Sequence, residues 1–205
     1  MSDTITMPLF PLSTVMFPGA RIPLQIFEPR YMDMVKNCMR DGSPFGIVNL
    51  VVGSEVASRY SDLPSFEAVG CAVNIVDWSA LPHGRLGIVV EGVQKIQVLE
   101  AQRDKSNLNI GEVIYLPEEE DCQLPEEFLP MWELLDTLQE HEAIQRLMLN
   151  IDSRSAISVA NHLSALLPIE HQTTHYQPTI RAGGPAALVL PRHRLLDHSA
   201  IGWSR

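Results

Sequence analysis

Glu28 and Arg30 form the charged pair of this sequence whose spacing suits acid–base chemistry or the grip of a substrate. They flank Pro29 and are followed by Tyr31. Acid–base catalysis usually needs a second titratable group in reach of the reacting atom, and the sequence designates none. We therefore favour a structural role: Glu28 at a helix N-terminus, Arg30 in a salt bridge beside it, and Tyr31 packed with its hydroxyl hydrogen-bonded.

Histidines and cysteines are the other candidates for reactive groups. His171 and His175 lie four residues apart, a spacing that could bind a metal from one helical face, but Pro178 leaves little room for that helix. Cys38 and Cys71 fall in apolar patterns, where burial disfavours the thiolate. We expect no catalytic residue, no cofactor and no metal site.

The charged pair stands at the junction of two predicted elements. Apolar residues at every second position from Ile22 to Ile26 predict a strand with one apolar face. Apolar residues three and four apart from Tyr31 to Met39 predict a helix with one buried stripe. Pro29 suits the first turn of that helix and Gly42 its end. The sequence thus predicts a strand–helix junction braced by residues 28–31.

Short apolar motifs, several of them containing proline, follow one another along the first half of the chain. They are MPLFPL at 7–12, VMFPG at 15–19, IPLQIFEPRY at 22–31, FGIV at 45–48, VGCA at 69–72, LPHGRL at 81–86 and VEGVQKI at 90–96. In type and order they resemble the N-terminal domain of Lon protease. The resemblance implies an α+β fold: a PUA-like β-barrel or twisted antiparallel sheet with one inserted helix, followed by a C-terminal helical subdomain. It also implies a role in engaging polypeptide substrates.

The other functions of Lon protease lack a counterpart here. Its ATPase needs a phosphate-binding loop that contains a Gly-Lys pair, and the sequence contains no such pair. A proteolytic domain would need about 150–200 further residues. We therefore expect a stand-alone recognition module and no enzymatic activity.

Residues 1–117 are predicted to form the β domain. Candidate strands cover 6–9, 21–27, 45–52, 66–77, 85–91, 94–103 and 108–115. Pro23 predicts that its strand lies at an edge, and Gly92 predicts a bulge or tight bend between two alternating runs. The polar segment 54–65 is predicted to be an exposed loop.

Beyond residue 117 the apolar period changes from two to about 3.6. Six acidic side chains within 117–127 predict a linker at 118–127. A helix from about 125 to 150, and a second one capped by Asp152 or Ser153, predict a helical hairpin over 128–170. The resemblance ends at about residue 171, so 171–205 is expected to be an irregular or short-helical tail.

Composition and charge limit the cellular compartments and the partners that we expect. Forty-five per cent of the 205 residues are hydrophobic, yet no run approaches the ~18 apolar residues of a membrane helix, and no signal peptide is evident. Three widely separated cysteines favour reduced thiols in a bacterial-type cytoplasm. The net charge of −10 disfavours nucleic acid as a partner.

The proline-rich arm between the first two strands carries Met16 and Phe17, our candidates for exposed peptide contacts. For most apolar side chains of this arm we favour the alternative, closure of one end of the barrel. The partners we expect are unfolded or extended polypeptides, with a separate protease or chaperone as a second candidate, as in protein quality control. Three other functions stay open: a PUA-like RNA-binding module, which the arginines near the C-terminus would serve, a small-ligand-sensing domain, and an enzyme of unrecognised type.

Overall fold

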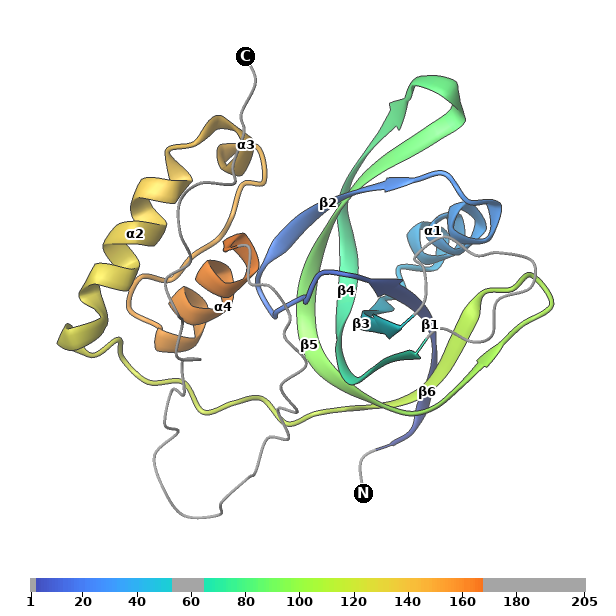
Figure 1. Ribbon diagram of the computed structural model, residues 1–205, viewed down its shortest axis with the longest axis horizontal. Helices are drawn as coiled ribbons and strands as arrows, with labels where there is room; N and C mark the ends of the chain where they lie inside the picture. The colour runs from blue at the N-terminus through green and yellow to red at the C-terminus, as the bar shows by residue number, and fades with distance from the viewer. Residues whose placement is uncertain (1–2, 53–64, 168–205) are drawn as a thin grey trace. The chain divides into compact units, whose positions relative to one another are not determined.

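The apolar runs of the first 115 residues form six strands of one mixed sheet (Figure 1). The computed structural model describes residues 3–52 and 65–167. The chain divides into a unit of Met1–Ile169, which contains all of these residues, and a second unit of Glu170–Arg205. The strands are β1 (Ile5–Leu12), β2 (Arg21–Ile26), β3 (Phe45–Val52), β4 (Ser65–Leu81), β5 (Arg85–Arg103) and β6 (Asn109–Tyr115).

Strands β5, β4, β3, β1 and β6 close into a ring, because β5 pairs with both β4 and β6. Strand β2 lies outside this ring and pairs with the first part of β5. The edge position that Pro23 predicts is therefore confirmed. One pair departs from the expected antiparallel pattern: β1 and β3 run parallel. The chain between them, which includes β2 and the first helix, supplies the crossover that a parallel pair requires.

Strand β5 runs without interruption through the position where the sequence suggested two strands. Ala72 of β4 lies opposite Gln94, whereas Val73 lies opposite Gly92, so Val93 is the extra residue of a β-bulge. A side chain at Gly92 would meet the carbonyl oxygen of Phe17 at 2.1 Å. The bulge thus brings β5 against the arm that precedes β2.

Helix α1 (Pro29–Asp41) follows β2 with hardly any loop. It begins with Pro29 in the first turn and ends at Gly42, whose φ of 64° is left-handed, as the sequence predicts. Its buried stripe packs on the sheet in the larger core cluster, together with Phe10 and Phe45. A smaller cluster, which includes Leu9, Val48 and Ile96, lies on the opposite face of the sheet.

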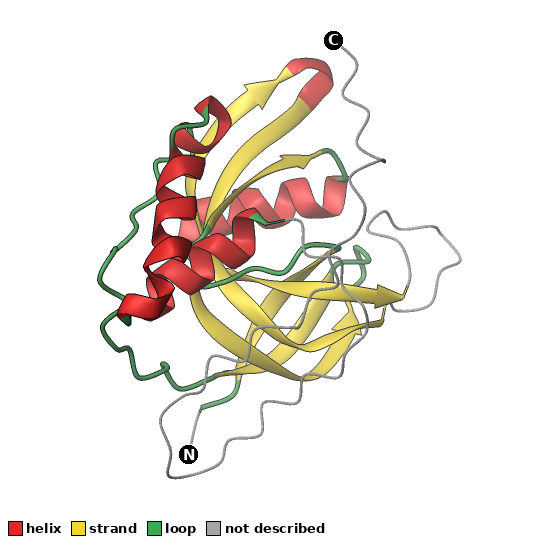
Figure 2. Cartoon of the chain, turned by 60° about the vertical axis from the view of Figure 1, so that its left-hand side comes forward, coloured by secondary structure: helices red, strands yellow, loops and turns green. Residues whose placement is uncertain are grey.

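The helical region differs from the long helix predicted over 125–150. It contains the short helix η2 (Glu126–Phe128), α2 (Leu129–Gln139), α3 (Glu142–Gln145) and α4 (Ala156–Leu166), shown in red in Figure 2. His141 breaks the long helix, because its backbone is extended and its Nδ1 accepts a hydrogen bond from the Ala143 nitrogen at 3.3 Å. The cap of α4 is Ser155, whose Oγ accepts from the Ser158 nitrogen at 2.9 Å, and neither Asp152 nor Ser153.

Contacts with the helical region fix the arm that precedes β2. Asn161 of α4 donates a hydrogen bond from Nδ2 to the Pro18 carbonyl at 3.2 Å. His162 is 2% exposed and lies against Gly19. Arg21 donates from Nη1 to the Met148 carbonyl at 2.7 Å. The predicted loop at 54–65, except for Ser65, and the predicted tail at 171–205 lie outside the described residues.

Candidate functional site

The junction residues are joined in one hydrogen-bonded brace. Glu28 accepts a hydrogen bond on Oε2 from Nε of Arg30 at 2.9 Å, and Arg30 also donates from Nη1 to the Asn107 carbonyl at 2.7 Å. The Arg30 side chain is 7% exposed and that of Glu28 is 16% exposed. Pro29 contributes the helix start. This arrangement holds the carboxylate and the guanidinium to each other and to the loop before β6.

Tyr31 is buried directly behind this brace. Its ring meets Phe10 edge-on, with centroids 4.2 Å apart and planes at 84°. Burial raises the pKa of the Tyr31 hydroxyl to about 12, although the nearby Arg30 charge acts in the opposite direction. The phenol therefore keeps its proton at neutral pH and cannot act as a base there.

The structure corrects the expected exposure of Met16. Met16 is 5% exposed and belongs to the larger core cluster, and Phe17 is half-buried against the same cluster. The reason is the return of the arm onto the bulge: the Gly19 nitrogen donates to the Gly92 carbonyl at 2.8 Å, and the Gly92 nitrogen donates to the Ala20 carbonyl at 2.9 Å. These bonds press the arm against the barrel end, which is the alternative favoured for most of its apolar residues.

The most exposed aromatic side chains among the described residues lie elsewhere. Phe27, directly after β2, and Trp78 of β4 are each 57% exposed. Each of them lines a hollow that β2 also lines. The sequence patterns place Phe27 in a strand and Trp78 at the end of one. They do not predict that both side chains are exposed, because long-range pairing decides which face of a sheet is covered.

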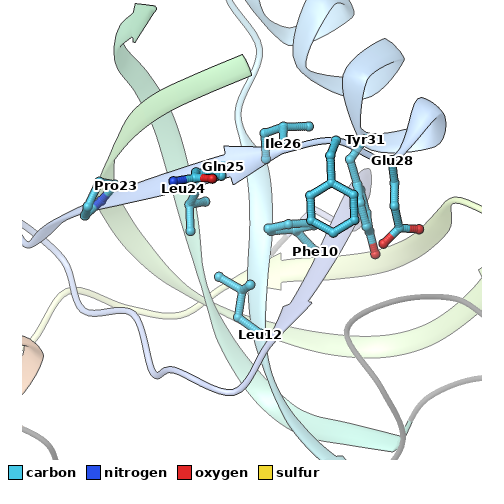
Figure 3. Close-up of a pocket in the computed structure, with 9 residues that line it drawn as sticks. Phe10, Leu12, Pro23, Leu24, Gln25, Ile26, Glu28 and Tyr31 are labelled. Carbon is cyan, nitrogen blue, oxygen red and sulfur yellow. The ribbon is translucent and has the colours of Figure 1, made fainter. Parts of the chain in front are cut away.

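The first hollow, of about 190 Å³, lies between β1 and β2 (Figure 3). Its walls are mainly apolar and are formed by Phe10, Leu12, Pro23, Leu24, Gln25, Ile26, Phe27, Glu28 and Tyr31. Figure 3 shows Phe10 and Leu12 on one side and Leu24 on the other. We call this hollow the β1–β2 pocket. The sequence identified the braced junction but missed the pocket, because β1 and β2 are not neighbours in the sheet and no local pattern shows that they line one hollow.

A second hollow, of about 290 Å³, is formed where β2, β5 and β4 lie side by side. It lies over Gly87, which has no side chain to fill it, and Pro23, Asp77 and Val89 are among its walls. Small-molecule sites usually measure about 300–1,000 Å³, so the β1–β2 pocket suits single side chains better than a whole ligand, whereas the second hollow reaches the lower end of that range. Strand β2 is the element that the two hollows share.

Neither metal binding nor a reactive thiol is supported by the part of the chain that the structure describes. There, no three His, Cys, Asp or Glu side chains come close enough to hold a metal ion. His171 and His175 lie outside that part. Burial raises the pKa of the Cys38 thiol and that of the Cys71 thiol, the latter to about 12. None of the described helices is both long enough and apolar enough to cross a membrane.

Known proteins resemble this chain in sequence and in structure. The chain is 27% identical over 99 residues to Lon protease 1 of Hydrogenovibrio crunogenus, a match that covers 48% of the chain but 12% of that protease. A crystal structure of a Lon N-terminal domain protein from Xanthomonas campestris shares 32% of the sequence, with a TM-score of 0.58. That match covers 80% of this chain and 84% of the other. Residues 6–173 match the substrate-binding domain of ATP-dependent protease La (LON), and the chain belongs to that family.

Proposed function

We propose that this protein is a non-enzymatic module that binds extended or unfolded polypeptide segments. The observation that carries the proposal is the family match over residues 6–173, a substrate-binding domain of a protease whose substrates are polypeptides. The geometry supports it, since the apolar β1–β2 pocket runs along an edge strand and has the size of side chains.

The chemistry of the β1–β2 pocket supports a role in binding and disfavours one in catalysis. Its two titratable groups are Glu28 and Tyr31. The Glu28 carboxylate is tied to Arg30, and the Tyr31 hydroxyl keeps its proton to about pH 12. Neither group is placed to exchange a proton with a bound chain at neutral pH.

Lon protease 1 is much longer than its match to this chain, so its ATP-dependent proteolysis is not carried over. In our proposal the module acts in the cytoplasm, a reducing compartment that suits its free thiols. A separate protease or chaperone then acts on the polypeptide that the module has bound.

The test is whether the protein distinguishes an unfolded chain from the same chain when folded. Reduced and amidomethylated lysozyme is a permanently unfolded, positively charged probe, and native lysozyme is its matched control. We expect chemical crosslinking and size-exclusion chromatography to show binding of the unfolded form only. Equal binding of both forms, or of neither form, contradicts the proposal.

A further inference from the structure

Strand β2 has one paired side and one free side. Within the described residues it pairs with β5 alone. The Gly92 nitrogen donates to the Ala20 carbonyl at 2.9 Å, so the main chain at position 20 faces β5. Because the facing direction alternates along a strand, Ile22, Leu24 and Ile26 face β5 as well.

The main-chain groups of Arg21, Pro23 and Gln25 consequently face the free side. Pro23 has no N–H to offer there, which explains why a proline is tolerated within this strand. Each of these residues keeps a carbonyl oxygen on this side, and Arg21 and Gln25 also keep an N–H, along about 13 Å of edge. A strand laid beside β2 would supply the matching N–H donors and carbonyl acceptors.

The β1–β2 pocket lies beside the same edge. Leu24 and Ile26 turn toward the core side of the sheet, where Phe10 and Leu12 of β1 form the opposite wall (Figure 3). Alternate side chains of an added strand point to opposite faces of the sheet. One set of these side chains would therefore point toward the pocket, and the other set toward solvent beyond the exposed Pro23 and Gln25.

The net charge of the protein favours added strands that carry positive charge. The sequence carries 25 acidic and 15 basic side chains, a net charge of −10. A field of this sign attracts cationic segments and repels anionic ones. Beside the second hollow, the Asp77 carboxylate has the same sign as this net charge, whereas the charge of Glu28 is compensated by Arg30.

From the free edge, the pocket beside it and the net charge we infer that β2 is a docking edge for an extended segment of about six residues. The segment joins the sheet as an added strand, alternates apolar side chains with lysine or arginine, and places its apolar side chains in the β1–β2 pocket. The inference rests on the proposed polypeptide recognition and names the class of polypeptide bound.

The experiment uses fluorescein-labelled octapeptides of alternating valine and lysine, with fluorescence anisotropy as the measurement. Two N-methylated forms carry methyl groups on the valine nitrogens or on the lysine nitrogens. An added strand turns one of these sets toward β2, so one form is expected to bind at least about tenfold more weakly. The other form is expected to stay within about twofold of the parent peptide. Equal affinity of the two methylated forms overturns the added-strand geometry.

Charge and pocket are tested with matched pairs. A valine–glutamate octapeptide is expected to bind about three- to tenfold more weakly than the valine–lysine peptide at low salt. Leu24→Glu is expected to weaken binding at least about tenfold, because it places a charge in the apolar pocket. Val93→Glu is the control, since Val93 is 50% exposed on the bulge and lines neither hollow. Thermal unfolding confirms that each variant is folded. The test with the methylated peptides uses the unchanged protein, so it does not depend on how a variant folds.

The outcomes separate this inference from the proposed function. If unfolded lysozyme binds but the valine–lysine octapeptide does not, the docking edge is wrong and polypeptide recognition stands. If Leu24→Glu and Val93→Glu bind alike, the pocket is not the site. If unfolded lysozyme does not bind either, both the inference and the proposed function fail.

Discussion

Arg30, in the first turn of α1, donates a hydrogen bond from Nη1 to the main-chain carbonyl of Asn107, 2.7 Å away in the loop before β6. Asn107 has a left-handed backbone, with φ of 64°, and the loop around it is held by the Asp104 carboxylate. The junction at the end of β2 is therefore anchored to a loop more than seventy residues later in the chain. One side of the β1–β2 pocket depends on this anchor.

We expect Glu28→Ala to lower the free energy of unfolding by about 2–3 kcal/mol, because it leaves the Arg30 guanidinium buried without its carboxylate. Asp33→Ala is the control on the same helix. Its ion pair with Lys36 is exposed, so the expected loss is about 0.5 kcal/mol or less. Urea denaturation measures both values, and equal losses would show that the brace contributes no more than a surface pair.

Tyr31→Ala is expected to cost more, about 3–5 kcal/mol, the range for removing a buried aromatic ring. Tyr31→Phe keeps the edge-on contact with Phe10 and removes only the hydroxyl. Its expected loss is about 1 kcal/mol, the usual contribution of one hydrogen bond. Denaturation of the two variants side by side separates ring packing from the hydroxyl. A Tyr31→Phe loss as large as that of Tyr31→Ala would contradict the packing role.

Asp104 gives the fold a contribution that depends on pH. Burial acts to raise the pKa of this carboxyl, but hydrogen bonds from the Ser106 hydroxyl and from the nitrogens of Leu108 and Ser106 outweigh it and lower the pKa. A lowered pKa in the folded state stabilises the fold above the unfolded value of about 3.9. This contribution is lost as the pH falls through the folded-state pKa.

We therefore expect Asp104→Asn to be less stable than wild type at pH 7, and the difference to shrink toward pH 2–3. Urea midpoints measured over that pH range test this expectation. A difference that stays constant with pH would mean that the charge of Asp104 has no role in the loop.

The bulge on β5 gives a steric prediction. A Cβ at Gly92 would lie 2.1 Å from the Phe17 carbonyl oxygen and 3.1 Å from the Cys71 sulfur. Gly92→Ala is expected to cost about 3 kcal/mol or more, since the arm must move away from the barrel. Val93→Ala, the exposed neighbour, is expected to change stability by about 0.5 kcal/mol or less. Similar melting temperatures for both variants would contradict the close approach of arm and bulge.

Local signals predicted the junction and the edge strand. Pro29 and Gly42 mark the ends of α1 through backbone preferences that act within a few residues. Pro23 indicates an unpaired side of β2 for the same local reason, the missing N–H. The family resemblance added the α+β fold, which the structural comparison bears out.

The sequence did not reveal the features that depend on contacts between distant segments. Met16 is buried because Gly92 admits the arm onto β5, a contact between segments more than seventy residues apart. The break at His141 lies in the polar stretch 139–142 between apolar residues of the stripe, and the side-chain cap at His141 starts a new short helix there. Strands β1 and β2 are not paired with each other in the sheet, so no local pattern indicates that their side chains line one pocket.

The most direct test of the proposed polypeptide recognition compares the binding of an extended peptide with that of RNA. Fluorescence anisotropy with a labelled, uncharged apolar peptide and a labelled single-stranded RNA, each at low and high salt, distinguishes the two. We predict micromolar binding of the peptide that changes little with salt, because apolar burial is not screened, and no binding of the RNA. Tight RNA binding that falls steeply with salt, with no peptide signal, would contradict the account and favour the RNA-binding alternative.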